Sequence, residues 1–534
     1  MLLCMPRTSS RLQRLFVVGL LAAAAGFAGT PFGSAHAATT AEVQPTPASP
    51  LTLAAPTTIS NASQRVLPSD HFAIGTRDRL LTTGKLAWLP TTGVPFDSVY
   101  QYASGTGPGT PGDAHVSTML AFAQKSQLLH TLPVISYFRM NGNYYGPAST
   151  PAACTATCTQ GDTAKRNLDH LNDPSFMQPY FTGLVDLFRS LDASYTGQVV
   201  VHFEPDLTGY AQQLSIDRTR CASDCVSGVS ADDPRGIRAA VASSGITQLK
   251  SFPDTMQGFY SAVLRLRDLY APRVSLAYHV SNWATASTGR VDNKNQTANS
   301  ITNGTVQVDA AALGRRVAAF AVLNGAAASP APLPGGTKSH FDLVFNDILD
   351  NDAGYFATVL NHPEYWWDSE NITLPNFARW ETYLGAIDAV TKLPTTVWQV
   401  PLGNTVYRVE NNTPGHYQDN RAQYFFDHLP ELKAIGVTGI IFGSSEKSTW
   451  DADNQADVTD NSQTVCTTLG TSSQTLQCPS QDATLTDDDG GYVRQRAAAY
   501  FANPLPLSST TTSSTTSSTT SSTTTSKTTT KVRR

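Results

Sequence analysis

Short apolar runs alternate with longer amphipathic stretches along most of this chain. The runs lie at 72–75, 98–104, 133–140, 197–206, 273–283, 341–347, 395–404 and 437–445. Nearly continuous apolar runs rich in β-branched and aromatic residues predict strands that are buried on both faces, as in a parallel sheet covered by helices. Eight such strands in succession favour a closed (β/α)8 barrel of the TIM type, with a doubly wound open sheet as the alternative.

Helix-like stretches separate most of these runs. We expect helices within 174–191, 255–270, 309–325, 375–391 and 418–436, where apolar residues recur at helical spacing. The interval between the first two runs lacks a convincing helix. The predicted fold class is therefore α/β, with one catalytic-like barrel over residues 69–505.

Both ends of the chain differ in composition from the predicted barrel. Residues 1–37 combine three arginines with an apolar run and end on Ala35-His36-Ala37, which predicts an export signal. Residues 38–68 are rich in Ala, Thr and Pro, and residues 506–534 are mostly Ser and Thr, so both predict disordered segments. We expect a secreted protein, extracellular or at the cell surface, with no membrane span beyond the signal.

Six cysteines remain after the signal, and they fall into pairs that are close in sequence. The pairs are Cys154 with Cys158, Cys221 with Cys225, and Cys466 with Cys478. An even number of cysteines in an exported chain favours disulfides, which here would brace loop insertions of the barrel. Zinc ligation is the rival interpretation.

Composition narrows the possible partners. The net charge is −5 and no stripe of Lys and Arg is present, so nucleic acid is not expected as a partner. The signatures G-x-S-x-G, H-E-x-x-H, G-x-G-x-x-G and the P-loop are missing. The Asp-rich stretch at Asp451, Asp453, Asp457 and Asp460, with Asp487, Asp488 and Asp489 later, fails the EF-hand spacing, since Ala456 stands where Gly is required. We expect a monomer without a cofactor, with a structural calcium ion as the minor alternative.

Polar and aromatic side chains gather where the predicted strands end. They are Tyr102, Tyr137, Arg139, Asn141, His202, His279, Trp283, Asn346, Asp352, Trp398, Gln399, Asn404, Arg421 and Glu446. The carboxyl ends of the strands form the active-site face of a (β/α)8 barrel. Aromatic faces beside amides and carboxylates suit sugar rings, so we predict that these residues bind a carbohydrate. Arg421 is also a candidate for holding a carboxylate, beside Asp419 as a helix cap.

The strongest local signal is the run VVVHFEPDLTGY, residues 199–210. Alternation along a strand places His202, Glu204 and Asp206 on one face. Pro205 cannot donate to the sheet, so Glu204 is expected at the barrel mouth, where partly apolar surroundings raise the pKa of a carboxyl group, as a general acid requires. A glycosidase also needs a second carboxyl group, for which Asp347 is the first candidate and Asp206 a reserve.

Three functions fit this pattern. The first is a glycoside hydrolase with Glu204 as general acid and Asp347 as base or nucleophile. The second is a metal-dependent hydrolase such as a polysaccharide deacetylase, with His279 and the polar residues of 202–206 as ligands. The third is a carbohydrate-binding barrel without catalysis, in which Glu204 is a structural carboxylate tied to Arg139.

Several segments resemble a mostly uncharacterised family of secreted bacterial proteins, some of which carry carbohydrate-binding or immunoglobulin-like modules. They are GVPFDSVYQY, VVVHFEPDL, FDLVFNDILDNDAGYF, VWQVPLGN, GHYQDNRAQYFFDH and DDDGGYVRQRAAAY. The resemblance covers roughly residues 70–502 and implies a glycosidase-like barrel. Glu204 is similar in place to the acid/base residue of retaining barrel glycosidases. However, Phe203 stands where those enzymes have Asn, and the seventh strand lacks their nucleophilic Glu. An inverting reaction with Asp347 therefore fits better.

Overall fold

The structure is a computed structural model. It describes residues 51–53, 70–81, 83–86, 89–91, 93–103, 114–141, 163–216, 225–285, 309–327, 333–337, 339–348, 352–405, 417–443, 468–469, 476–477 and 492–507. All of them belong to one compact unit, which spans 45–534. The predicted export signal, most of the predicted leader and the tail beyond 507 lie outside these ranges. In the described part of the chain, none of the helices has the length and apolar character that crossing a bilayer requires.

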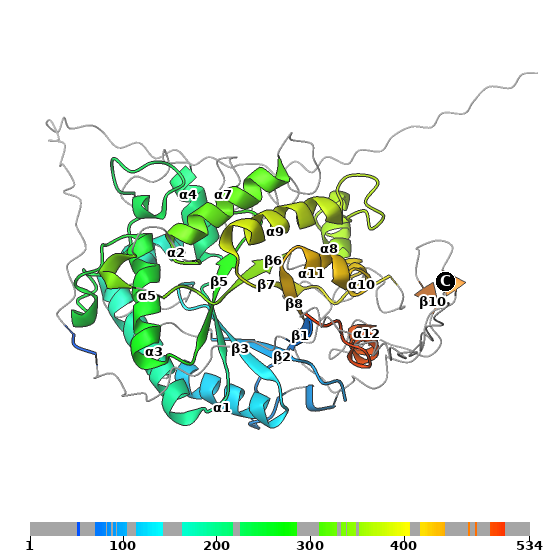
Figure 1. The fold of residues 1–534 in the computed structure, drawn as a ribbon, viewed down its shortest axis with the longest axis horizontal. Helices are drawn as coiled ribbons and strands as arrows, with labels where there is room; N and C mark the ends of the chain where they lie inside the picture. The colour runs from blue at the N-terminus through cyan, green and yellow to red at the C-terminus, as the bar shows by residue number, and fades with distance from the viewer. Residues whose placement is uncertain are drawn as a thin grey trace, which may run out of the picture. The chain divides into compact units, whose positions relative to one another are not determined.

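Eight parallel strands close into a barrel in the order in which they occur in the chain (Figure 1). They are β1 Ala73–Arg77, β2 Ser98–Tyr102, β3 Leu132–Tyr137, β4 Val200–Phe203, β5 Ser275–Val280, β6 Leu343–Asp347, β7 Thr395–Val400 and β8 Val437–Phe442. The circle closes where β1 pairs with β8, with Ile74 opposite Ile440. The predicted (β/α)8 class is confirmed, and the doubly wound alternative is wrong.

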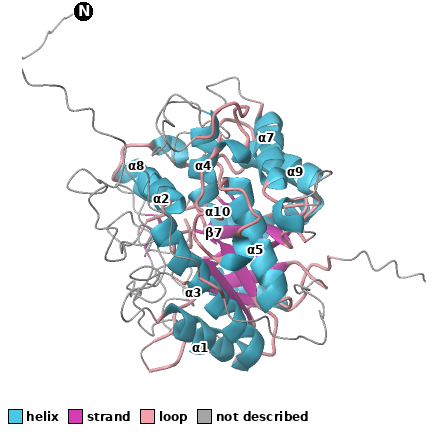
Figure 2. Cartoon of the chain, turned by 90° about the vertical axis from the view of Figure 1, so that its left-hand side faces the viewer, coloured by secondary structure: helices cyan, strands magenta, loops and turns pink. Residues whose placement is uncertain are grey.

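Helices enclose the strands (Figure 2). They are α1 His115–Leu128, α2 Thr163–Asn172, α3 Pro174–Ser194, α4 Leu207–Ile216, α5 Met256–Tyr270, α7 Ala310–Leu323, α8 Ala353–Thr358, α9 Phe377–Thr391, α10 Arg421–Asp427, α11 Leu429–Ala434 and α12 Tyr492–Phe501. The single helix predicted at 418–436 is wrong, because two short helices meet there at His428. Pro430 has no amide hydrogen, so an unbroken helical hydrogen-bond ladder cannot pass through it.

Successive strand residues point alternately into the lumen and toward the helices. Val134, Val200, Ala277 and Phe345 belong to the cluster that fills the lumen. Their neighbours in sequence, such as Val201, belong to the larger core between strands and helices. Lumenal positions recur every two residues along a strand. The residue two positions after each of these four is therefore also lumenal and lies closer to the carboxyl end of its strand, where the predicted site lies.

The carboxyl-terminal part of the described chain returns to the first strand. The amide of Phe72 donates to the carbonyl of Leu505 at 2.7 Å, and that of Leu507 donates to the carbonyl of Asp70 at 3.0 Å. The hydroxyl of Tyr500 in α12 donates to the carbonyl of Phe72 at 2.5 Å. Helix α12 and residues 505–507 are therefore attached to the barrel.

Three residues of the predicted leader also bind to the barrel domain. The amide of Leu51 donates to the carbonyl of Gly245 and its carbonyl accepts from the amide of Thr247, both at 2.8 Å. The side chain of Gln248 bonds to both backbone groups of Leu53, whose own side chain is buried. At 51–53 the leader is thus an attached strand-like segment, where its composition predicts a solvated chain.

Cys225 is the one predicted disulfide cysteine within the described residues, where its backbone bridges to that of Ile237. Cys154, Cys158, Cys221, Cys466 and Cys478 lie outside them. A two-stranded hairpin, β9 Thr468–Leu469 and β10 Leu476–Gln477, lies between the last two in sequence. The three pairings stay predictions.

Candidate active site

Polar side chains from four neighbouring strands form a hydrogen-bonded chain across the upper lumen. Ser136 Oγ of β3 lies 3.1 Å from His202 Nδ1 of β4, and His202 Nε2 lies 2.9 Å from His279 Nδ1 of β5. His279 Nε2 in turn lies 3.1 Å from Ser281 Oγ and 3.4 Å from Asp347 Oδ1, at the end of β6. Lumenal alternation along parallel strands brings these groups to one level of the barrel.

His202 is held rigidly within this chain. Its ring lies 4.5 Å, centroid to centroid, from the rings of both Phe345 and Trp398, and no part of the residue is exposed. Burial lowers the pKa of His202 well below its usual value, and the neighbouring His279 acts in the same direction. His202 is therefore a neutral histidine with both ring nitrogens in hydrogen bonds.

Asp347 and Trp398 stand opposite each other where β6 pairs with β7. The Asp347 side chain is 15% exposed, whereas Trp398 is almost fully buried. Among the residues that the structure describes, neither Asp347 Oδ1 nor Trp398 Nε1 has a hydrogen-bond partner. Both atoms have almost no surface open to solvent, so the exposed part of the Asp347 side chain is not this oxygen.

An aromatic corner lies on the other side of the lumen. Tyr102 of β2 meets Phe138 and Trp398 edge to face, with ring centroids 5.9 Å apart in both pairs. The side-chain amide of Gln399 donates to the Tyr102 hydroxyl, and the Arg77 guanidinium lies 5.4 Å from the Tyr102 ring centre. Tyr102 and Phe138 are half-buried. Ser136, Phe138 and Arg77 escaped the sequence analysis, although lumenal spacing from neighbouring strand residues points to Ser136 and Arg77.

The strand pattern predicted that Glu204 shares a face with His202, and the structure shows that it does not. Its φ is 46°, in the left-handed region, so alternation ends there. The carboxylate accepts hydrogen bonds from the amides of Arg139 and Met140, both at 3.1 Å, and from the hydroxyl of Tyr180 at 2.7 Å. Because Tyr180 belongs to α3, the carboxylate lies on the helix side of the barrel wall, while His202 faces the lumen.

The surroundings of Glu204 raise the pKa of its carboxyl group to about 7. Burial without exposed surface is the largest cause, opposed by the Tyr180 hydroxyl, by the amides of Arg139 and Met140, and by the charge of Arg139. Asp206, two residues later, also has a left-handed φ, of 75°. It is only half-buried and directly precedes α4.

Two predicted rim residues face the helices instead. Tyr137 stacks on Phe203 at 5.7 Å, between the barrel and α3. The side-chain amide of Asn346 donates to the carbonyl of Val280 at 2.7 Å and is fully buried. Tyr137 follows the lumenal Ser136 and Asn346 precedes the lumenal Asp347. Their side chains therefore lie on the opposite face of their strands.

Two others are engaged by neighbouring elements. Trp283 packs against Tyr210 of α4 with ring centroids 4.8 Å apart. The side-chain oxygen of Asn141 accepts a hydrogen bond from Arg166 of α2 at 2.6 Å. Both contacts tie a loop at the carboxyl end of the barrel to a helix, and they give these residues structural roles.

Asp419 and Arg421 form a fully buried ion pair. The Asp419 carboxylate accepts from the amide of Arg421 at 2.6 Å and from that of Ala353, the first residue of α8, at 2.7 Å. Burial raises the pKa of Asp419, with the Arg421 charge acting against it. The Arg421 guanidinium also lies over the Trp367 ring. The N-cap of α10 is Asn420, whose side chain makes no capping hydrogen bond, so Asp419 binds the first amide of that helix without being its cap residue.

Asp352 and Asn404 are fully buried beyond the ends of β6 and β7. The two loops touch, since a Cβ added at Gly403 would stand 2.8 Å from Asp352 Oδ1. The other predicted groups of this rim, Glu446 and the aspartates between 451 and 489, lie outside the described residues.

The proposed metal ligands are not assembled into a metal site. Within the described ranges, no group of three or more His, Cys, Asp or Glu side chains is placed to hold an ion. His202 uses both ring nitrogens inside the lumenal chain, and Glu204 is directed toward α3.

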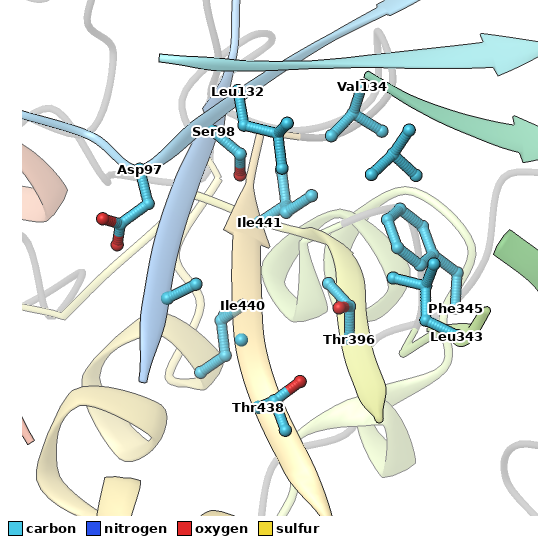
Figure 3. A pocket seen from close by; sticks show the side chains of 13 residues that line it. Asp97, Ser98, Leu132, Val134, Leu343, Phe345, Thr396, Thr438, Ile440 and Ile441 are labelled. Atoms are coloured by element: carbon cyan, nitrogen blue, oxygen red, sulfur yellow. The ribbon is translucent and has the colours of Figure 1, made fainter. Parts of the chain in front are cut away.

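A cavity of about 40 Å³ lies at the opposite end of the barrel (Figure 3). Its lining is mostly aliphatic, with Leu132, Val134, Leu343, Ile440 and Ile441 among the labelled side chains. Asp97 borders it, but its two oxygens accept from His71 at 2.9 Å and from the amide of Ile74 at 2.8 Å. Part of the lining, such as Ala73, Ser98, Leu132 and Leu343, consists of first residues of strands, so the cavity belongs to the amino-terminal base of the barrel, which serves stability.

No protein-family model and no curated protein matches this chain. Among solved structures it is similar to a Bacteroidetes-affiliated GH5 cellulase linked with a polysaccharide utilization locus, at 8% identity over 81% of this chain and 92% of that one, with a TM-score of 0.38. It is also similar to an exo-β-1,4-mannosidase from Opitutaceae bacterium strain TAV5, at 10% identity over 83% and 62%, with a TM-score of 0.36. Similarity at this level transfers no activity to this chain.

Proposed function

We propose that this chain is a secreted glycoside hydrolase whose reaction takes place at the carboxyl end of the barrel, with Asp347 as general base or nucleophile. The observation that carries the proposal is the Asp347 side chain at the end of β6, which is 15% exposed and has its Oδ1 3.4 Å from His279 Nε2. Tyr102 and Phe138, at the carboxyl ends of β2 and β3, offer half-buried aromatic edges, which suit the apolar face of a sugar ring.

The second carboxyl group of the reaction is, in this proposal, Asp206. The sequence hypothesis assigns the general acid to Glu204, and a pKa of about 7 would keep a proton on that carboxyl group. Its oxygens, however, are bonded to α3 and to the loop after β3, without exposed surface. Asp206 is partly exposed and ends the same strand connection. Glu204 then acts as a positioning residue that holds this loop.

The strand order favours inversion of configuration. β4 and β6 are separated by β5 alone, so their backbones lie about 10 Å apart at ordinary strand spacing. Inverting enzymes hold their two carboxyl groups roughly 6.5–9.5 Å apart, and retaining enzymes about 5 Å apart. An Asp347 side chain at the end of β6 and an Asp206 side chain in the connection after β4 that both reach inward match the wider separation.

A panel of polysaccharides and oligosaccharides with reducing-end detection tests this proposal on the full secreted chain. On the substrate that responds, Asp347→Asn and Asp206→Asn are each expected to lower kcat by about 10²–10⁴-fold, with binding of the polysaccharide retained. Glu204→Gln is the matched carboxyl-to-amide control and is expected to keep kcat within about tenfold of wild type, since a positioning residue loses only geometry.

The outcomes separate the alternatives. Loss of turnover in Glu204→Gln with full turnover in Asp206→Asn would return the acid role to Glu204. Binding without turnover of any substrate by the wild type would identify a carbohydrate-binding barrel without catalysis. Unchanged turnover in Asp347→Asn contradicts the proposal outright.

A further inference from the structure

The direction of the hydrogen bonds in the lumenal chain follows from its last member. An ionised Asp347 carboxylate can only accept, and the atom that faces it is His279 Nε2 at 3.4 Å. A hydrogen on Nε2 makes this approach favourable, whereas a lone pair there would face the negative oxygen. A neutral imidazole with its hydrogen on Nε2 has an acceptor at Nδ1, so His279 Nδ1 accepts from His202 Nε2.

The same reasoning extends one residue deeper. With its hydrogen on Nε2, the neutral His202 ring has a lone pair at Nδ1, where it meets the Ser136 hydroxyl at 3.1 Å. Ser136 therefore donates to His202, His202 donates to His279, and His279 Nε2 bonds to Ser281 Oγ with the Asp347 carboxylate 3.4 Å away. Ser281 Oγ, at 3.1 Å, shares the last hydrogen, and both serine hydroxyls can rotate to suit this direction.

We infer that His202 and Ser136 are positioning residues that fix His279 in the tautomer that presents an N–H to Asp347. His202 has no exposed surface and is enclosed by Phe345 and Trp398, so it acts through His279 and does not touch a substrate. The chain moves no proton in the reaction. When Asp347 takes a proton from the attacking water, His279 keeps its own hydrogen and holds the carboxylate in place.

The tautomer can be measured directly and independently of any activity. In the full-length protein labelled with ¹⁵N in its histidines, the nitrogen shifts report which ring nitrogen of each residue carries hydrogen. We expect hydrogen on Nε2 and a lone pair on Nδ1 in both His202 and His279. His279→Gln and His202→Gln identify the signals by their loss.

Two variants of His202 test its control over the His279 tautomer. His202→Phe keeps an aromatic ring between Phe345 and Trp398 but cannot donate, so His279 is expected to populate both tautomers. His202→Gln retains an N–H donor and is expected to keep His279 in the single tautomer. If His202→Phe fails to fold, Ser136→Ala provides the milder test, since it frees His202 Nδ1 and is expected to populate the second tautomer of His202.

A wild-type His279 with hydrogen on Nδ1, or unchanged tautomers in both His202→Phe and Ser136→Ala, overturns the inference. Its effect on catalysis rests on the proposed function. On a responsive polysaccharide, His202→Phe should lower kcat by about 10–100-fold at unchanged KM, and His202→Gln should restore most of it. Absence of turnover in the wild type would refute the proposed function and leave the tautomer result standing.

Discussion

Glu204 shows how one residue can depart from a clear sequence pattern. The run VVVHFEPD reads as a strand to its end, and a residue before proline is normally extended. Glu204 instead adopts φ 46°, a conformation that costs about 1–3 kcal/mol for a residue other than glycine. Three hydrogen-bond donors from the loop after β3 and from α3 compensate for it. Those donors come from distant parts of the sequence, so no local pattern could reveal them.

The buried carboxyl group of Glu204 makes stability depend on pH. Its pKa rises from 4.5 in the unfolded chain to about 7 in the folded one, so between these values the folded state holds a proton that the unfolded state has released. Stability should therefore fall as the pH rises through this window, by about 3 kcal/mol in total. Denaturant unfolding at pH 4.5 and pH 8 should show this fall in the wild type.

Glu204→Gln serves as the control, because it keeps the shape of the side chain and cannot titrate. As the pH rises, the unfolding free energy of the wild type should fall relative to that of the variant. An identical pH dependence in both proteins would mean that Glu204 does not hold the proton.

At the scale of elements, the alternation of strands and helices was readable because each run is long and apolar. All eight strands lie within or beside the predicted runs. The sequence did not predict which side of a strand faces the lumen. A barrel wall is buried on both faces, so the residues that face the lumen and those that face the helices are both apolar. Tyr137 and Asn346 were therefore placed at the rim, although the lumenal positions beside them belong to Ser136 and Asp347.

Helices α7 and α9 lie against each other (Figure 1) through a glycine contact that provides a matched test. A Cβ added at Gly314 of α7 would overlap the carbonyl oxygen of Tyr383 in α9. Gly314→Ala should therefore destabilise the protein by about 1–3 kcal/mol. At Gly385, also in α9, an added Cβ would stand 3.5 Å from Ile435, an ordinary contact.

Gly385→Ala should accordingly stabilise the protein by about 0.5–1 kcal/mol, because alanine is the better helix former. Thermal or denaturant unfolding of the two variants beside wild type gives the comparison. A stabilising Gly314→Ala would show that the two helices are not in this close contact.

At the scale of the whole molecule, the barrel is closed twice. β1 pairs with β8, and residues 505–507 pair with 70–72. The first closure follows from counting eight strands in the sequence. The second does not, because the attachment depends on single backbone hydrogen bonds and on α12, whose short pattern in sequence resembles any amphipathic stretch. The attachment of 51–53 to 245–248 is hidden in the same way.

Two truncations separate the attached end from the Ser/Thr-rich segment. Ending the chain after residue 507 should leave the unfolding midpoint unchanged, since the bonds to Phe72 and Asp70 remain. Ending it after residue 491 removes α12 and those bonds, uncovers Phe72, and should lower the midpoint by several degrees. Equal midpoints for the two truncated chains would show that α12 adds nothing to the stability of the barrel.

The central claim is that Asp347 carries the chemistry at the mouth of this barrel. It is tested most directly by the initial rate of reducing-end release by Asp347→Ala, measured with and without added formate, a small carboxylate able to enter the space that the side chain leaves. The account predicts a rate at least about 10²-fold below wild type that formate partly restores. An alanine variant as fast as wild type would contradict it.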